Sequence, residues 1–149
     1  FGQVISLLSG TDFKPEEYND KQQGVPYITG ASSLSEHGVL INRWTEVPRV
    51  IVNRGDVLLV CKGSGYGKTV ICDIDEAHIA RQIMAIKKMT TLDMPYIRVF
   101  LQANFEQIKC VKKRWISHFA RNDTKSIYAA WKSFRRDLQQ FIIKALCRA

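Results

Sequence analysis

Residues with the chemistry of a phosphate-binding loop lie between Cys61 and Val70, in the stretch CKGSGYGKTV. Glycines before a Lys-Thr pair are typical of loops in which backbone N–H groups surround nucleotide phosphates and the lysine reaches over them. The tetrapeptide DEAH, Asp75–His78, follows shortly afterwards and also occurs in ATP-driven helicases. These residues raise the question of whether the chain hydrolyses a nucleoside triphosphate.

The spacing argues against a nucleotide site. Such a loop has four residues between its first glycine and Gly-Lys-[Ser/Thr], whereas three separate Gly63 from Gly67. The lysine and threonine should also open a helix whose N-terminus faces the phosphates. The following residues, TVICDID, alternate and are β-branched, which indicates a strand. We therefore predict a β-hairpin here, with a P-loop-like NTPase built on Gly63–Thr69 as the alternative.

The tip of this predicted hairpin carries two cations, hydroxyl groups and an aromatic ring. Such a tip can approach a nucleic-acid backbone or enter a groove, because glycines allow close contact and lysines pair with phosphates. A solvated loop is the other interpretation. The candidate DNA-binding residues at the tip are Lys62, Ser64, Tyr66, Lys68 and Thr69.

Chain breakers and charge divide the 149 residues into two parts. All nine glycines lie between Gly2 and Gly67, and the last proline is Pro95. Residues 1–108 hold 11 Lys/Arg against 12 Asp/Glu, net −1, whereas residues 109–149 hold 11 against 2, net +9. The basic character of the chain therefore belongs to its C-terminal part, where it could add DNA affinity without sequence preference.

The N-terminal part alternates turn residues with short β-branched runs, namely VPYIT, GVLIN, RVIVN, DVLLV and TVICDI. This alternation of turn residues and short apolar runs predicts a β-rich domain with tight connections over residues 1–92. The segment from Glu76 to Met89 permits either a helix or a strand.

The C-terminal part, residues 93–149, predicts two helices. Asp93-Met94-Pro95 is a helix start, and Tyr96–Phe119 reads as the first helix. In the second helix, apolar residues are spaced by alternating intervals of four and three, as in helices that pack on another helix. The expected architecture is α+β, with an antiparallel helical hairpin after the β-rich domain. The apolar stripe predicts a subunit contact through Ile127, Trp131, Phe134, Leu138 and Phe141.

Cysteines and histidines are scattered along the chain. The four cysteines form no C-x-x-C pair, so we expect reduced thiols, no metal site and a cytoplasmic protein. No apolar run reaches the eighteen residues that a membrane span needs. Phe1 in place of a start methionine suggests a fragment of a longer chain.

Several spaced blocks resemble the target recognition domain of type I restriction-modification specificity subunits. These blocks are ISLLSGTDFKPEEYND, GVPYITGASSL, NRGDVLLVCKGSGYGKTVICDID, IARQIMAI and YIRVFLQANFEQIK. They cover Phe1 to about Lys109 in the order of the family. The resemblance implies a β-rich unit of double-β-helix-like character, followed by a helical part that leads into a spacer.

The resemblance also implies a function in which the chain catalyses nothing. It would read one half of a split sequence in double-stranded DNA and position a partner methyltransferase subunit, with which a restriction subunit can assemble. S-adenosylmethionine and ATP with magnesium would belong to those partners, and this chain would bind no cofactor. Besides the hairpin tip, the candidate DNA-binding residues are Lys14, Thr29, Ser32, Ser33 and Arg43.

The chain departs from the family in two respects. Full specificity subunits carry two recognition domains, and this chain holds one, so a half-subunit that forms a homodimer is a hypothesis. After FLQANFEQIK the chain continues from Cys110 as CVKKRWISHFARNDTKSIYAAWKSFRR, without the glycine-containing segment usual in the family. Its regular apolar spacing favours a true helix over a foreign end. A basic module that binds nucleic acid without sequence preference is the remaining alternative.

Overall fold

The computed structural model describes residues 6–63, 65–89, 93–110 and 124–146. The chain divides into a β unit, Ser6–Gln102, and a helical unit that begins at Ala103. The domain boundary expected after residue 92 precedes this division and stays a prediction. The elements are β1 (Leu7–Ser9), η1 (Pro15–Glu17), β2 (Val25–Ile28), η2 (Ala31–Ser33), β3 (Leu34–Ser35), β4 (Gly38–Val39), β5 (Trp44–Thr45), β6 (Ile51–Asn53), β7 (Val57–Val60), β8 (Thr69–Ile71), β9 (Glu76–Ile79), β10 (Ile83–Ile86), α1 (Met94–Ala103) and α3 (Thr124–Leu146).

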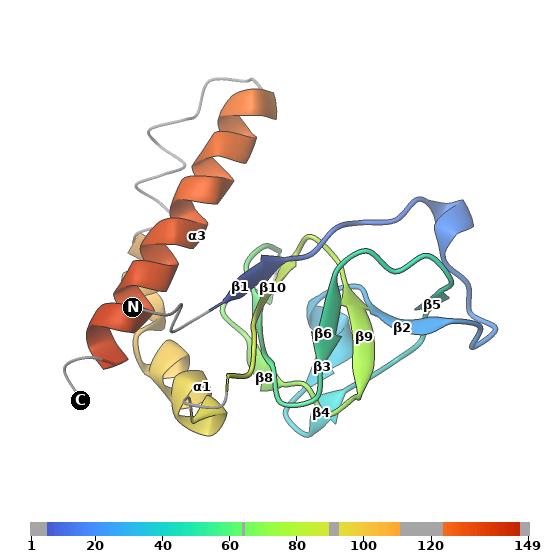
Figure 1. Cartoon of the computed structure of the whole chain (residues 1–149), viewed down its shortest axis with the longest axis horizontal. Helices are drawn as coiled ribbons and strands as arrows, with labels where there is room; N and C mark the ends of the chain where they lie inside the picture. Colours follow the sequence, from blue (N-terminus) through green and yellow to red (C-terminus); the bar gives the residue numbers. More distant parts are fainter. Residues whose placement is uncertain (1–5, 64, 90–92, 111–123, 147–149) are drawn as a thin grey trace. The chain divides into compact units, whose positions relative to one another are not determined.

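Two four-stranded sheets and a short ribbon form the β unit (Figure 1). The first sheet has the order β1-β10-β7-β8 with antiparallel neighbours, and the second has the order β5-β2-β9-β6. In the second sheet, Tyr27 and Ile28 of β2 pair in parallel with His78 and Ile79 of β9. Strands β3 and β4 form the ribbon. The expected α+β class is confirmed, whereas the double-β-helix-like arrangement stays a prediction.

The core of the β unit draws on both sheets. Strand β7, VLLV, is a continuous apolar run and is buried along its whole length, as expected for an inner strand. Leu58 and Val60 from this strand join one apolar cluster with Ile28 of β2 and Val52 of β6. The core therefore lies between the sheets and holds their strands in register.

The ambiguous segment from Glu76 to Met89 forms two strands, β9 and β10, and no helix. In β10, IMAI pairs with β7 on one side and with β1 on the other. All four residues of β10 are buried, so its environment is that of an inner strand. Long-range pairing therefore decides between the two structures that its composition permits.

A buried histidine links three segments of the β unit. The Nδ1 atom of His78 accepts hydrogen bonds from the backbone N–H groups of Arg49 and Val50, at 3.2 and 3.1 Å. Its Nε2 atom lies 2.9 Å from the carbonyl oxygen of Thr11, which can only accept, so Nε2 carries the proton. Burial lowers the pKa of His78, and the Arg49 charge adds to this effect while the contacts with Thr11 and Asp12 oppose it. The neutral ring is therefore the folded form.

Helix α1 begins where the sequence predicts a helix start. The carboxylate of Asp93 accepts a hydrogen bond from the N–H of Tyr96, and Pro95 lies in the first turn. The expected single helix Tyr96–Phe119 is interrupted, because α1 ends at Ala103, a turn follows at Asn104 and a second helical stretch covers residues 105–110. Asparagine favours helix caps over helix interiors, which accounts for the break.

The helical unit contains α3, which has 23 residues and confirms the second expected helix. Leu138 and Ile142 are buried, and Phe141 is partly buried. The side chains of Ile127, Trp131 and Phe134 lie outside the described residues, as does the expected turn of the helical hairpin. The hairpin and the subunit contact stay predictions. No helix in the described part of the chain is long and apolar enough to cross a membrane.

Candidate nucleic-acid interface

The glycine-rich stretch forms a β-hairpin, as predicted. Strands β7 and β8 are antiparallel, with Leu58 opposite Val70 and Leu59 opposite Thr69. Gly63 and Gly67 have φ angles of 84° and 93°, which glycine adopts without the strain that other residues meet. Thr69 opens β8 where a nucleotide loop would require a helix. The NTPase alternative is therefore wrong for this stretch.

The hairpin tip packs back against the β unit. A Cβ atom on Gly65 would lie 2.1 Å from the Cβ of Ala31 in η2, so only glycine fits at this contact. The ammonium group of Lys68 donates to the carbonyl oxygen of Leu34, and Thr69 is buried. The lysine that resembles that of a phosphate loop thus bonds the hairpin to the neighbouring ribbon, and the threonine is covered by the fold.

The candidate DNA-binding residues differ in their exposure. Among them, Lys14 and Ser32 are exposed, Ser33 and Thr69 are buried, and Ser64 lies outside the described residues. The remaining five are partly buried, namely Thr29, Arg43, Lys62, Tyr66 and Lys68.

Thr29 and Ser33 contact one another within the fold. Their hydroxyl oxygens lie 3.1 Å apart, and the backbone N–H of Thr29 donates to the Ser33 hydroxyl.

Burial lowers the pKa of Lys62, and the charge of Arg81 lowers it further. The role of each of the ten candidates in DNA binding stays a prediction.

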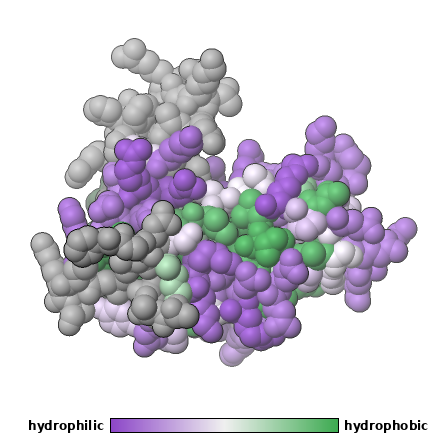
Figure 2. Space-filling model, viewed as in Figure 1, coloured by the Kyte–Doolittle hydropathy of each residue, from purple (hydrophilic) through white to green (hydrophobic). Residues whose placement is uncertain are grey.

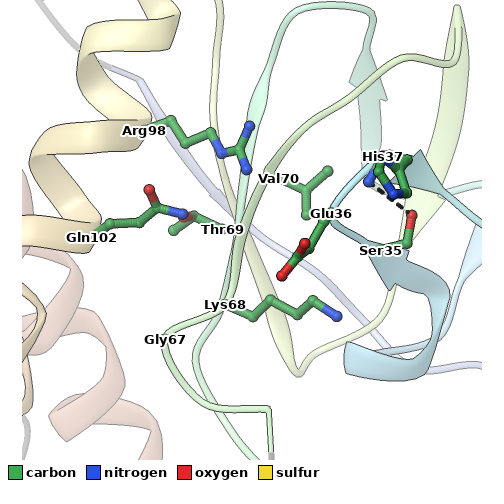
Figure 3. Close-up of a pocket in the computed structure, with 9 residues that line it drawn as sticks. All are labelled: Ser35, Glu36, His37, Gly67, Lys68, Thr69, Val70, Arg98 and Gln102. Carbon is green, nitrogen blue, oxygen red and sulfur yellow. Dashed lines mark hydrogen bonds between the residues drawn. The ribbon is translucent and has the colours of Figure 1, made fainter.

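A pocket of about 430 Å³ lies beside β8 and α1 (Figure 3). The Oγ1 atom of Thr69 and the Nε atom of Arg98 are buried there and have no hydrogen-bond partner in the described part of the chain. Gln102 extends from α1 towards Thr69, and the carboxylate of Glu36 lies on the far side (Figure 3). The pocket thus offers donors together with a carboxylate, which suits a polar ligand better than an isolated phosphate.

A second polar pocket, of about 260 Å³, contains Arg43 and Tyr18. The guanidinium carbon of Arg43 lies 4.6 Å from the centre of the Tyr18 ring, a cation–π contact. Asn19, Asp20 and Asn42 complete the lining. We call this group the Arg43 platform.

The Arg43 platform is fixed to the second sheet. The carbonyl oxygen of Arg43 accepts the N–H of Tyr27 at 2.8 Å. Asn19 and Trp44 exchange two backbone hydrogen bonds, both 2.8 Å long. The side chain of Asn19 accepts the N–H groups of Lys21 and Gln23, which shapes the loop around the pocket. The platform is therefore preformed.

Ion pairs hold three other arginines of the β unit. Arg49 pairs with Glu17, Arg54 with Asp75 and Arg81 with Asp12. The hydrogen bond from Arg54 lowers the pKa of Asp75, so the first carboxylate of DEAH has a structural partner. Within the described residues, neither Arg43 nor Arg98 forms an ion pair.

Sequence reasoning identified Arg43 but not Tyr18 or Arg98. Tyr18 and Arg43 lie far apart in the chain and meet because the next residues, Asn19 and Trp44, form an antiparallel bridge. Arg98 belongs to no recognisable sequence motif, and only its position on α1 opposite Thr69 brings it into the pocket.

The face of the molecule in Figure 2 shows hydrophobic residues gathered on the β unit between hydrophilic ones. No group of three or more potential metal ligands occurs within the described ranges.

Comparisons with known proteins identify the fold. No protein-family profile and no curated protein sequence matches the chain. The HsdS subunit of Thermoanaerobacter tengcongensis matches with a TM-score of 0.65 and 18% identity, over 99% of this chain and 38% of that one. The S subunit of the type I restriction-modification system of M. genitalium matches with a TM-score of 0.53 and 13% identity, over 95% of this chain and 41% of that one.

A third match comes from a structure that describes complex assembly and conformational transition of the type I R-M system. Its TM-score is 0.56 at 15% identity, over 97% of this chain and 44% of that one. The chain thus spans about two fifths of the length of these proteins. The chain has the fold found in the S subunits of type I restriction-modification systems.

Proposed function

We propose that this chain is a DNA target recognition domain that reads one half of a split site as part of a type I restriction-modification specificity subunit. The observation that carries the proposal is the match over 99% of the chain to an HsdS subunit, which includes both the β unit and the helices. The quoted sequence blocks point to the same family independently. In this role the chain performs no catalysis and supplies the sequence preference of an assembly.

The proposal extends to partners and location. A methyltransferase subunit would use S-adenosylmethionine, and a restriction subunit would use ATP with magnesium, so that this chain binds no cofactor itself. The assembly would act in the cytoplasm. The stripe on α3 would contact another subunit or a second copy of the chain. Since Leu138 is buried already, we expect Phe141, which is partly buried, to contribute more to such a contact.

Direct DNA contacts fall to the candidates whose polar groups reach solvent. Lys14 and Ser32 are exposed and suit phosphate contacts, which position a protein without reading sequence. Ser33 and Thr69 are buried, so we propose that they shape the surface and do not touch DNA. Arg43 combines partial exposure with a guanidinium that pairs with no carboxylate among the described residues.

Selection from a random double-stranded DNA library with the purified full chain tests the proposal. The expected result is a short preferred motif, with a specificity ratio that persists as salt is raised. Expression of the chain with its methyltransferase partner should then give adenine methylation at a split motif containing that half-site. A library that shows no preference at any position would refute the proposal.

A basic module without sequence preference is the second candidate function. The net charge of +9 over residues 109–149 favours it, because clustered lysines and arginines bind the phosphate backbone of any sequence. In that case affinity should fall with salt equally for all sequences. The same library distinguishes the two functions, since only a recognition domain enriches a motif.

A further inference from the structure

We propose that Arg43, held against Tyr18, recognises the guanine of a G·C base pair in the major groove, an inference that rests on the proposed function. The guanidinium group of arginine matches the O6 and N7 acceptors of guanine with two parallel hydrogen bonds, and this is the most common specific contact between proteins and DNA. Three properties of the Arg43 platform support the assignment.

The first property is orientation. The Tyr18 ring lies below the guanidinium, at 4.6 Å, and itself packs against Tyr27 with ring centres 5.8 Å apart. Tyr27 is buried and contacts Phe13 edge to face at 5.1 Å. The arginine therefore rests on a ring that is supported by a cluster of buried aromatic side chains. Preorganisation of this kind reduces the conformational entropy lost when the side chain binds a planar partner.

The second property is the availability of donors. Arg49, Arg54 and Arg81 each direct a guanidinium nitrogen at a carboxylate. Arg43 is in the same unit and forms no ion pair with any described residue. Stacking on a tyrosine uses the face of the guanidinium and leaves its N–H groups at the edge directed outwards. These are the groups that bind guanine.

The third property is the mixed charge of the pocket. Asp20 lines the same pocket, is exposed and forms no ion pair with Arg43, although the structure describes both residues. A carboxylate at this place would repel a phosphate. The edge of a G·C pair presents two acceptors on guanine and an N4 donor on cytosine, and carboxylates accept hydrogen bonds from that donor. The pair Arg43 and Asp20 therefore fits a base-pair edge better than a phosphate.

The test compares the motifs selected from a random DNA library by the full chain and its variants. Arg43→Lys keeps the charge but cannot form the bidentate contact, so total DNA affinity should be retained while the preference for one guanine falls roughly 5-fold to 150-fold. Arg43→Ala should lose the same preference. Arg54→Ala, which removes an exposed arginine paired with Asp75, should leave the motif unchanged.

A modified base then tests the contact directly. At the guanine identified by Arg43→Lys, 7-deazaguanine removes the N7 acceptor and should weaken binding of the unchanged protein, with no further effect on Arg43→Ala. Tyr18→Phe keeps the ring and should keep the preference, whereas Tyr18→Ala should weaken it at that position alone. Unfolding curves must show that each variant is folded.

Two outcomes overturn the inference. If Arg43→Ala weakens binding to all sequences equally, Arg43 contacts phosphate and reads no base. If the motif is the same in all variants, Arg43 lies outside the DNA contact, while the proposed function stands. A chain that selects no motif at all overturns the proposed function together with the inference, and it is distinguished by the behaviour of the unchanged protein.

Discussion

Protonation of His78 should destabilise the β unit in a narrow and predictable range of pH. The ring is completely buried, its Nδ1 atom accepts two backbone N–H groups, and its Nε2–H faces the Thr11 carbonyl. A proton on Nδ1 would place a donor against the two donors of Arg49 and Val50. The folded-state pKa is therefore lower than the ordinary value of 6.5.

The sign and size of this pH dependence follow from the linkage between proton binding and unfolding. In the unfolded chain His78 binds a proton near pH 6.5, whereas in the folded chain it binds one only at lower pH. The stability contributed by neutral His78 is therefore complete above pH 6.5 and falls as the pH decreases towards the folded-state pKa. One proton limits the slope to about 1.4 kcal/mol per pH unit. Urea unfolding at pH values from 7.5 to about 5.5 measures the free energy of unfolding across this window.

His78→Gln removes the titrating group and should abolish this slope. It should also cost about 2–4 kcal/mol at pH 7.5, because backbone groups lose their partner and the ring leaves its contact with Phe13, whose centre is 4.2 Å away. His37→Gln is the matched control, since His37 is exposed and its loss should leave the slope unchanged. A slope that persists in His78→Gln and vanishes in His37→Gln would refute the reasoning.

Three further predictions concern other parts of the chain. Asp56→Ala should lower the free energy of unfolding by about 3–5 kcal/mol, measured in urea, because the buried carboxylate accepts the Lys87 ammonium at 2.6 Å and backbone N–H groups. Gly65→Ala should cost about 1–3 kcal/mol by collision with Ala31, and adding Ala31→Gly should restore part of the loss; additive effects would exclude the contact. Iodoacetamide at pH 8 should modify exposed Cys110 and spare Cys72, whose pKa is raised by burial, as peptide mass spectrometry can show.

Local pattern was sufficient for most strands of the β unit and for the start of α1. The runs VPYI, IVN, VLLV and TVI are β-branched or alternate, and turn residues separate them, so each is a strand on local grounds alone. Asp93 and Pro95 mark the helix start through capping and a fixed φ angle. Strands β1 and β5 were not predicted, because LLS in β1 has no β-branched residue and β5 has only two residues.

The candidate site was predicted less completely than the fold. The sequence suggested that Lys68 and Thr69 bind a phosphate. In the structure the ammonium group of Lys68 bonds Leu34, and Thr69 lines the pocket beside Arg98. Composition gives the chemical type of a side chain and not its direction, which depends on how the hairpin packs. Tyr18 and Arg43 likewise meet only when the distant residues Asn19 and Trp44 form their antiparallel bridge.

By itself the sequence determined the α+β class, the hairpin in place of a nucleotide loop, and the separation of a basic tail from a nearly neutral domain. Each of these depends on residue types and on spacings of a few residues. Tertiary structure alone decided that residues 76–86 form strands, that His78 is buried as a neutral ring, and that the tip of CKGSGYGKTV is held against Ala31. These features depend on contacts between segments distant in the chain, whose free energies no local window contains.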